Sequence, residues 1–131
     1  MSTLTANPNP RRGEIWTAYL DDAPQRHWVV IISLDGRNLS DRTSSVLGVP
    51  FGSYGKLGPT VAQLPPGETG LPEVSYLKAH FIQVVNKSKL IERQRRVLSA
   101  TRMRELVKMV RLAIDPDALG SDDKIGLARR S

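Results

Sequence analysis

The first predicted strand lies between residues that break regular structure on both sides. Residues 15–20 are Ile-Trp-Thr-Ala-Tyr-Leu, with Gly13 before them and Asp21-Asp22 after them. Aromatic and β-branched residues favour extended backbone, whereas glycine and aspartate favour turns. The folded part of the chain is therefore expected to begin with a short β-strand.

More short strands are expected to follow. Residues 27–34 form a nearly continuous apolar run rich in β-branched residues, which predicts a strand buried on both faces. The other predicted strands are 45–51, 60–64, a strand or bent pair of strands within 74–86, and a short edge strand within 90–98. The intervening segments 35–44, 52–59 and 65–70 are rich in Gly, Pro, Asp, Asn and Ser, which predicts loops and turns.

One helix is predicted, from residue 99 or 101 to residue 114. Ser99 or Thr101 can cap its start, and Asp115-Pro116 ends it. Its apolar residues recur at helical spacing: Met103, Leu106, Val107, Val110, Ala113 and Ile114. Short strands followed by one helix predict a mainly β fold, in which a strongly curved sheet closes towards a barrel and the helix covers its open side.

The length of 131 residues fits a single domain. We place that domain at 11–114, after a flexible leader at 1–10 and before a flexible tail at 115–131. The chain has no cysteine, which removes disulfides and thiolate chemistry and suits a reducing cytoplasm. It has neither an apolar run long enough to span a bilayer nor the pattern of a secretory signal, so we expect a cytoplasmic protein that does not enter a membrane.

The formal net charge of +6 favours polyanionic partners such as RNA, DNA or an acidic protein. Small basic proteins also exist that bind no particular anion, so charge alone leaves this open. The basic run Lys87, Lys89, Arg93, Arg95 and Arg96 has the same two interpretations, a path for a phosphate backbone or a solvated edge.

The order of motifs over residues 11–114 resembles that of the MazF/PemK (Kid) toxins of bacterial toxin–antitoxin pairs. The shared features are the Arg12-Gly13-Glu14-Ile15-Trp16 strand, an acidic turn, an Arg before an apolar strand, a third strand containing Pro, a Thr-Gly-Leu turn and a final helix. The resemblance implies an SH3-like small barrel of the MazF/PemK/CcdB type and a homodimer. It also implies sequence-specific, metal-independent and cofactor-free cleavage of single-stranded RNA, inhibited by a cognate antitoxin.

Such cleavage begins when a ribose 2′-hydroxyl attacks the neighbouring phosphate. A base must take the hydroxyl proton, cations must hold the anionic phosphorane, and an acid must protonate the leaving oxygen. Arg26 precedes the second predicted strand, where the family places an Arg followed by Pro; here His27 replaces the Pro. A guanidinium at this point can bind a phosphate through two hydrogen bonds, so we assign Arg26 a catalytic role.

The family's second position is a Thr or Ser that follows a Pro and a hydrophobic residue. Pro50-Phe51 matches this pattern, but Gly52 comes next, so the hydroxyl is missing unless Ser53 supplies it. Ser53 is equally well explained as a solvated loop residue. Gly52 leaves room for a ligand to approach the backbone closely.

The penultimate strand of PemK-like toxins carries an Arg and an Asp two residues apart, followed by Gln and another Arg. In the family these residues are followed by a hydrophobic residue and an Asp, with which we align Val85-Asn86. In this alignment Lys78 takes the place of the first Arg and His80 that of the Asp, and Phe81 and Gln83 take the places of the Gln and the second Arg. The register can slip by a residue. Lys78 can neutralise a phosphate and His80 can move protons at neutral pH, although a lone strand histidine is often structural. His27 is the alternative proton carrier.

Aromatic residues near these positions can stack on bases: Trp16, Trp28, Phe51 and Tyr54. Trp16 and Trp28 are equally explained as core residues, as strand aromatics usually are. No set of residues has the spacing of a metal site.

Four functions are consistent with the sequence. The first, which we favour, is an RNA-cleaving toxin whose site is altered. The others are a CcdB-like toxin that binds gyrase, an RNA-binding or regulatory module that has lost catalysis, and an unrelated basic barrel. Arg26 and the Arg-Gly-Glu-Ile-Trp strand favour the first, whereas Gly52, His80 and Gln83 favour the binding module.

Overall fold

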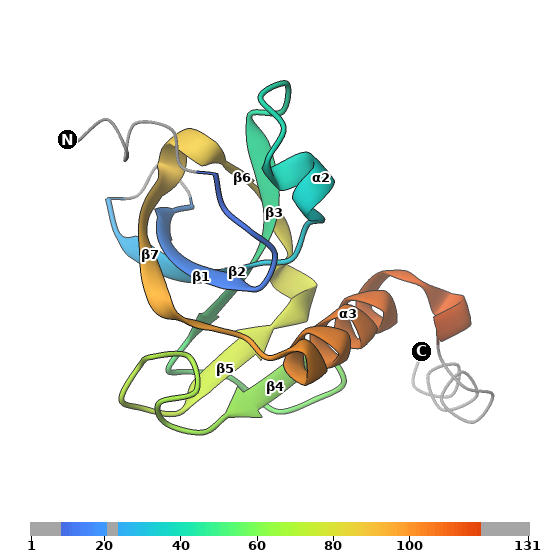
Figure 1. Cartoon of the computed structure of the whole chain (residues 1–131). Coiled ribbons are helices and arrows are strands. Elements are labelled where there is room, and N and C mark those ends of the chain that lie inside the picture. Colours follow the sequence, from blue (N-terminus) through green and yellow to red (C-terminus); the bar gives the residue numbers. More distant parts are fainter. Residues whose placement is uncertain (1–8, 21–23, 119–131) are drawn as a thin grey trace.

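The structure, a computed structural model, describes residues 9–20 and 24–118. It is mainly β, with one long helix after the strands (Figure 1). The strands are β1 Glu14–Tyr19, β2 Arg26–Ile31, β3 Ser45–Gly52, β4 Val61–Leu64, β5 Ser75–Lys78, β6 Gln83–Asn86 and β7 Leu90–Val97. The helices are α2 Asp35–Asn38 and α3 Ala100–Ile114, and the 3-10 turns are η1 Ala79–Phe81, η2 Lys87–Lys89 and η3 Pro116–Ala118.

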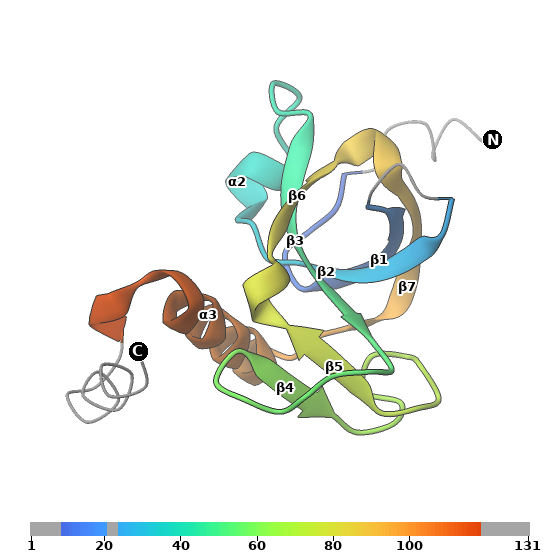
Figure 2. The same cartoon turned by 180° about the vertical axis from the view of Figure 1, so that it is seen from behind.

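The strands form one antiparallel seven-stranded sheet in the order β4-β5-β3-β2-β1-β7. The long strand β3 pairs with β6 along its first half and with β5 at its last two residues, Phe51 and Gly52. The bent pair of strands predicted within 74–86 is therefore confirmed, because η1 turns the chain between β5 and β6 (Figure 2). This turn brings the end of β5 beside the end of β3.

The core lies on both faces of the curved sheet. Val30 on β2 packs in a cluster with Ile15, Leu77 and the buried side of α3, whereas its neighbours Val29 and Ile31 pack in a second cluster with Trp16. Because successive side chains of a strand point to opposite faces, the apolar run of β2 is buried on both, as predicted.

The sheet does not close into a continuous barrel, because no described strand joins β7 to β4. The turn between β4 and β5 fills this seam instead. An added Cβ at Gly70 would lie 3.5 Å from the Arg96 side chain on β7, and Glu68 forms an ion pair with Arg102 on α3. The fold is thus mainly β with a C-terminal helix, as predicted, but the sheet is not closed into the predicted barrel, and a turn lies at the seam.

The Arg-Gly-Glu-Ile-Trp motif has a structural role. Glu14 is buried, and its carboxylate accepts hydrogen bonds from the Arg11 backbone N–H at 2.8 Å, the Trp16 indole at 3.1 Å and Arg93 at 3.3 Å. Gly13 has a φ of 91°, which other residues rarely adopt. Its N–H and C=O bond to Ile31 and Leu98, so the motif joins β1 to its surroundings.

Some local predictions need correction. The predicted loop 35–44 begins with the short helix α2, whose Asn38 is fully buried and donates to the Ser33 carbonyl. The edge strand β7 is long rather than short. On α3, Met103, Leu106 and Val110 are buried as predicted, but Ile114 is 70% exposed because the helix extends past the sheet it covers.

Three predictions fall on chain outside the described residues: most of the leader, the turn at Asp21-Asp22 and most of the tail. Of the leader's last residues, Pro10 is buried. Ser99 caps α3 by accepting the Arg102 N–H, as predicted. No helix among residues 9–20 and 24–118 is long and apolar enough to cross a membrane.

Candidate functional site

A cleft of about 370 Å³ lies where the ends of several strands meet. It is lined by Leu20, His27, Pro50, Phe51, Gly52, Lys78, Phe81 and Gln83. These residues come from the end of β1, the start of β2, the ends of β3 and β5, η1 and the start of β6. The cleft therefore brings together four of the residues proposed from the sequence: His27, Gly52, Lys78 and Gln83.

The sheet fixes the backbone of these four residues. His27 pairs with Ala18, Gly52 with Tyr76, Lys78 with Val61 and Gln83 with Gly48. The His27 and Lys78 side chains are half-buried, so each is held by the fold yet open to solvent. Gln83 donates to the Phe81 carbonyl at 3.2 Å, which fixes the amide at the cleft wall.

Gly52 is an open position in the cleft wall. A Cβ added there meets no other atom within 4 Å, and the backbone φ of Gly52 is not positive. Neither packing nor backbone conformation therefore requires a glycine. The missing hydroxyl of the family pattern is a feature of the sequence that the fold does not impose.

The other residues proposed for catalysis do not line the cleft. Arg26 is exposed at the start of β2, next to His27 in the chain. Ser53 follows β3 and is exposed. His80 is exposed on η1, where its Nδ1 lies 2.8 Å from the Thr60 hydroxyl and its ring lies 4.3 Å from that of Phe81. Because η1 turns the chain, Phe81 rather than His80 faces the cleft.

The four aromatic candidates lie in different environments, and Phe51, which is buried, lines the cleft. Trp16 is 8% exposed in the core, and its indole N–H binds Glu14, so the core interpretation holds for it. Trp28 is half-buried against Phe51, with ring centroids 6.2 Å apart. Tyr54 is 81% exposed beyond the cleft.

Sequence reasoning did not assign Phe81 or Leu20 to the site. Phe81 is 51% exposed and lines the cleft. The available signal was its place next to His80, but the 3-10 turn that directs it into the cleft has no clear sequence pattern.

The cleft can bind an anion. Its described lining contains two basic side chains, His27 and Lys78, and no carboxylate. Apolar walls formed by Pro50, Phe51 and Phe81 reduce the exposure of a bound group to water, which strengthens its attraction to a cation. Among residues 9–20 and 24–118, no three His, Cys, Asp or Glu side chains are grouped so that they could hold a metal ion.

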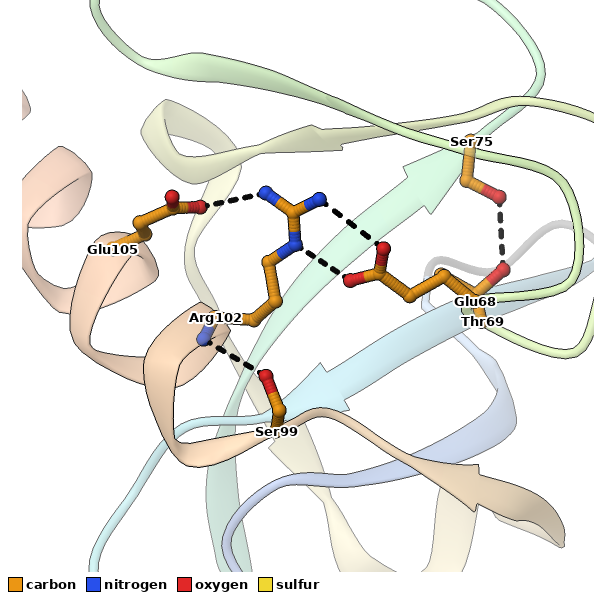
Figure 3. A network of polar contacts seen from close by, with 6 residues as sticks. All are labelled: Glu68, Thr69, Ser75, Ser99, Arg102 and Glu105. Carbon is orange, nitrogen blue, oxygen red and sulfur yellow. Dashed lines mark hydrogen bonds and ion pairs between the residues drawn. The ribbon is translucent and has the colours of Figure 1, made fainter.

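Outside the cleft, two ionised side chains show how carboxylates and basic groups are held by the fold. Arg102 on α3 donates to Glu68 at 2.6 and 3.1 Å and to Glu105 at 2.9 Å (Figure 3). These bonds, to Glu68 first, raise the pKa of Arg102 further above its usual range. The Arg12 backbone N–H, and secondly Asn38, bind the Asp35 carboxylate and lower its pKa.

The fold is shared with solved toxin structures. Mycobacterium tuberculosis toxin MazF-mt6 has a TM-score of 0.67 at 19% identity, covering 78% of this chain and 96% of that one. An endoribonuclease from a mycobacterial species, in complex with its cognate antitoxin, has a TM-score of 0.66 at 21% identity, covering 80% and 94%. MazE–MazF from Deinococcus radiodurans gives 0.64 at 18% identity, covering 80% and 95%. These identities establish the fold alone.

The family follows from the sequence itself. No curated protein matches the chain. A family model described as PemK-like, MazF-like toxin of type II toxin-antitoxin system matches residues 11–114, which are most of the chain. This protein therefore belongs to the PemK-like, MazF-like toxin family of type II toxin–antitoxin systems.

Proposed function

We propose that this protein is the toxin of a toxin–antitoxin pair and that it cleaves single-stranded RNA, with sequence specificity, at the cleft described above. The observation that carries the proposal is the presence of His27 and Lys78, from distant parts of the chain, in one partly apolar cleft whose described lining has no carboxylate. Family membership supports it, as does the fold shared with proteins described as endoribonucleases. The interpretation as an unrelated barrel is excluded by the family match.

In the proposed reaction a ribose 2′-hydroxyl attacks the adjacent phosphorus, and the bond from phosphorus to the 5′-oxygen breaks. His27 takes the hydroxyl proton as the new P–O bond forms, since a neutral imidazole is the ordinary base near neutral pH. Lys78 stabilises the extra negative charge of the phosphorane. The products are a 2′,3′-cyclic phosphate and a 5′-hydroxyl whose proton comes from a protonated group or water. Because side chains supply the positive charge, no metal is required.

Three neighbouring positions would hold the substrate. Arg26, exposed beside His27 at the start of β2, would bind the reacting phosphate or the one next to it. Gly52 lets that phosphate approach the backbone. Phe81 offers an exposed ring for base stacking, and the fixed Gln83 amide can read the edge of a base, which would provide the sequence preference.

The proposal includes two protein partners. A homodimer would join two shallow clefts into a longer groove for a linear substrate, and an acidic, disordered segment of an antitoxin would cover the basic surface. A particle of monomer mass by light scattering, with or without RNA, would contradict the dimer. We expect the antitoxin to be encoded by a gene next to this one. If the product of that gene does not bind this protein, or binds it with an affinity that does not change with salt, the antitoxin proposal is contradicted.

The test is cleavage of single-stranded RNA in EDTA by the wild type and by Arg26→Ala, His27→Ala, His80→Ala and Ser53→Ala variants. We expect a 2′,3′-cyclic phosphate product, and a rate loss on the order of a hundredfold or more for Arg26→Ala and for His27→Ala. Full activity of Arg26→Ala would refute its role. Activity lost in His80→Ala but retained in His27→Ala would move the proton transfer to His80.

A second function has its own support: the empty hydroxyl position at Gly52 favours a binding module that has lost catalysis. Gly52→Thr separates the two, because the structure has space for the side chain. If the folded wild type cleaves no RNA and Gly52→Thr gains cleavage, the fold is competent and catalysis was lost at this position. If neither protein cleaves RNA but both bind it, the binding module is the correct interpretation.

A further inference from the structure

The basic run that includes Lys87, Lys89 and the arginines of β7 is not part of the cleft, and its two lysines lie on η2. Of its members, Lys87 is tied to the fold, because its ammonium donates to the Ser40 carbonyl at 2.9 Å. The arginines surround a separate hollow of about 460 Å³, lined by Gly70, Glu92, Arg93, Gln94, Arg95 and Arg96. This hollow has three guanidinium groups and one carboxylate in its described lining, which favours an anionic ligand.

A β-bulge brings these arginines to the surface. Glu14 pairs with Val97 and Trp16 with Arg93, so the interval that holds only Ile15 on β1 holds residues 94–96 on β7. In a regular strand, consecutive side chains point to opposite faces. Here Arg95 and Arg96 are consecutive and both exposed, and they lie within the segment where the bulge interrupts the register.

The arginines differ in whether they are paired. Arg93 forms an ion pair with Glu14 at 3.3 Å, although its side chain remains 63% exposed. Within the described part of the chain, Arg95 and Arg96 have no carboxylate partner. Strand β7 pairs with no strand other than β1 in that part of the chain, and on its other side the turn between β4 and β5 lies beside Arg96. Arg95 and Arg96 remain exposed there, so two guanidinium groups without a carboxylate partner are available to a ligand.

We propose that the bulged edge of β7 is a second RNA-binding surface, at which Arg95 and Arg96 bind the phosphodiester backbone of single-stranded RNA outside the cleft. This inference rests on the proposed function, which makes RNA the substrate. A guanidinium can bind a phosphate through two hydrogen bonds and can also stack on a base.

Other occupants fit this edge less well. A second copy of the chain would bring arginines against arginines. An extended acidic peptide added to the edge would need a regular row of backbone N–H and C=O groups, and the bulge interrupts that row. A flexible RNA strand bound by side chains needs no such regularity.

The position of the edge suits one RNA strand that occupies both sites. Leu20, just beyond the end of β1, lines the cleft, and Trp16 on β1 pairs with Arg93. Arg95 and Arg96 lie beyond this point, opposite Ile15, so roughly 17 Å of β1 separates them from Leu20. A few nucleotides beyond the scissile phosphate can cover this distance.

The experiment measures binding of an RNA of about 16 nucleotides by fluorescence anisotropy over roughly 0.05–0.3 M salt. Its 2′-oxygens are methylated, so that it cannot be cleaved. The variant is Arg95→Gln/Arg96→Gln, which leaves the Arg93–Glu14 ion pair in place. The matched control is Arg104→Gln/Lys108→Gln on the exposed side of α3, which changes the net charge equally. Thermal melting of each protein checks that it is folded.

We expect the β7 variant to bind roughly tenfold more weakly than the wild type, and the slope of log affinity against log salt to decrease in magnitude by roughly 1.4, as loss of two phosphate contacts to a single strand predicts. The control should keep the wild-type slope, and Arg95→Lys/Arg96→Lys should keep most of it, since the charge remains.

Binding of a polyglutamate peptide is measured in the same way. Three outcomes would overturn the inference: an unchanged salt slope in the β7 variant, an equal loss of RNA affinity in the control, or a β7 variant that loses affinity for the peptide but not for RNA. The last outcome would indicate an acidic protein as the partner. The result is separate from catalysis. A wild type that binds through β7 but cleaves no RNA would contradict only the proposed function, and one that cleaves RNA without any contribution from β7 would contradict only this inference.

Discussion

The basic side chains of the cleft and those of the ion-pair cluster on α3 have opposite environments. Arg102 lies between Glu68 and Glu105, and its guanidinium makes three hydrogen bonds to carboxylates. His27 and Lys78 lie in a cleft whose described lining has no carboxylate. A cation that is already paired stabilises the fold, whereas an unpaired cation in a partly apolar cleft remains available to a phosphate. Charge count alone, which is +6 for this chain, does not reveal this difference.

The largest expected effect is on catalysis. Lys78→Ala should lower the rate of RNA cleavage on the order of a hundredfold or more, because it removes the cation held beside the proposed phosphorane. Stability should change little, since the side chain is half-buried and has no carboxylate partner among the described residues. The measurement is single-turnover cleavage with thermal melting in parallel. A variant that loses stability but not rate would show that Lys78 belongs to the fold rather than to the site.

The reverse result is expected for the paired arginine. Arg102→Ala should destabilise the fold by about 1–2 kcal/mol, since it removes charge-assisted hydrogen bonds that are only partly exposed to water. The cleavage rate at a temperature where the variant is folded should match the wild type. Urea unfolding measures the loss of stability, and single-turnover cleavage measures the rate.

Arg104→Ala serves as the control for Arg102→Ala, because Arg104 is exposed on the same helix and has no ion-pair partner in the described chain. If the two substitutions destabilise the protein equally, the cluster contributes no stability beyond helix propensity. If Arg102→Ala slows cleavage, the separation of fold and site that we infer is wrong.

The smallest effect concerns acid stability. The Asp35 carboxylate has a lowered pKa in the folded state, chiefly because the Arg12 N–H binds it. Its contribution to stability is therefore complete above its ordinary pKa of 3.8 and is lost as the pH falls through the lower folded-state value. The advantage of the wild type over Asp35→Asn should shrink over that acidic window. Urea unfolding at several pH values checks this, and a constant difference between the two proteins would contradict the assigned hydrogen bond.

The sequence predicted the elements of the fold well where local pattern and burial agree. The apolar run of β2 indicated burial on both faces. The helical spacing of Met103, Leu106 and Val110 placed α3 correctly. In both cases the apolar residues mark the buried face of the element. Ile114 follows the same spacing but is exposed, because spacing does not show where the covering sheet ends. The short helix α2 was missed, since its Asp-Gly-Arg-Asn sequence is as typical of a turn as of a helix.

The residues that line the cleft were predicted only in part, for a related reason. Gly52, Lys78 and Gln83 were found by their motif positions, and the structure places them in one cleft with His27. His80 was preferred over His27 because motif alignment treats a strand as regular. The 3-10 turn η1 instead places Phe81 in the cleft and leaves His80 against Thr60. The direction of a side chain at a turn depends on backbone angles that residue type does not fix.

The sequence by itself determined the class of fold, the family and the list of candidate residues. These properties follow from patterns repeated along one stretch of chain, such as the motif in which Gly13 and Glu14 hold β1 in place. Only the tertiary structure decided which basic side chains are paired and which share a cleft. In the sequence, Arg102 and Lys78 are both basic residues without a visible partner. In the fold, the turn at Glu68 brings a carboxylate next to Arg102, whereas no carboxylate lines the cleft around Lys78.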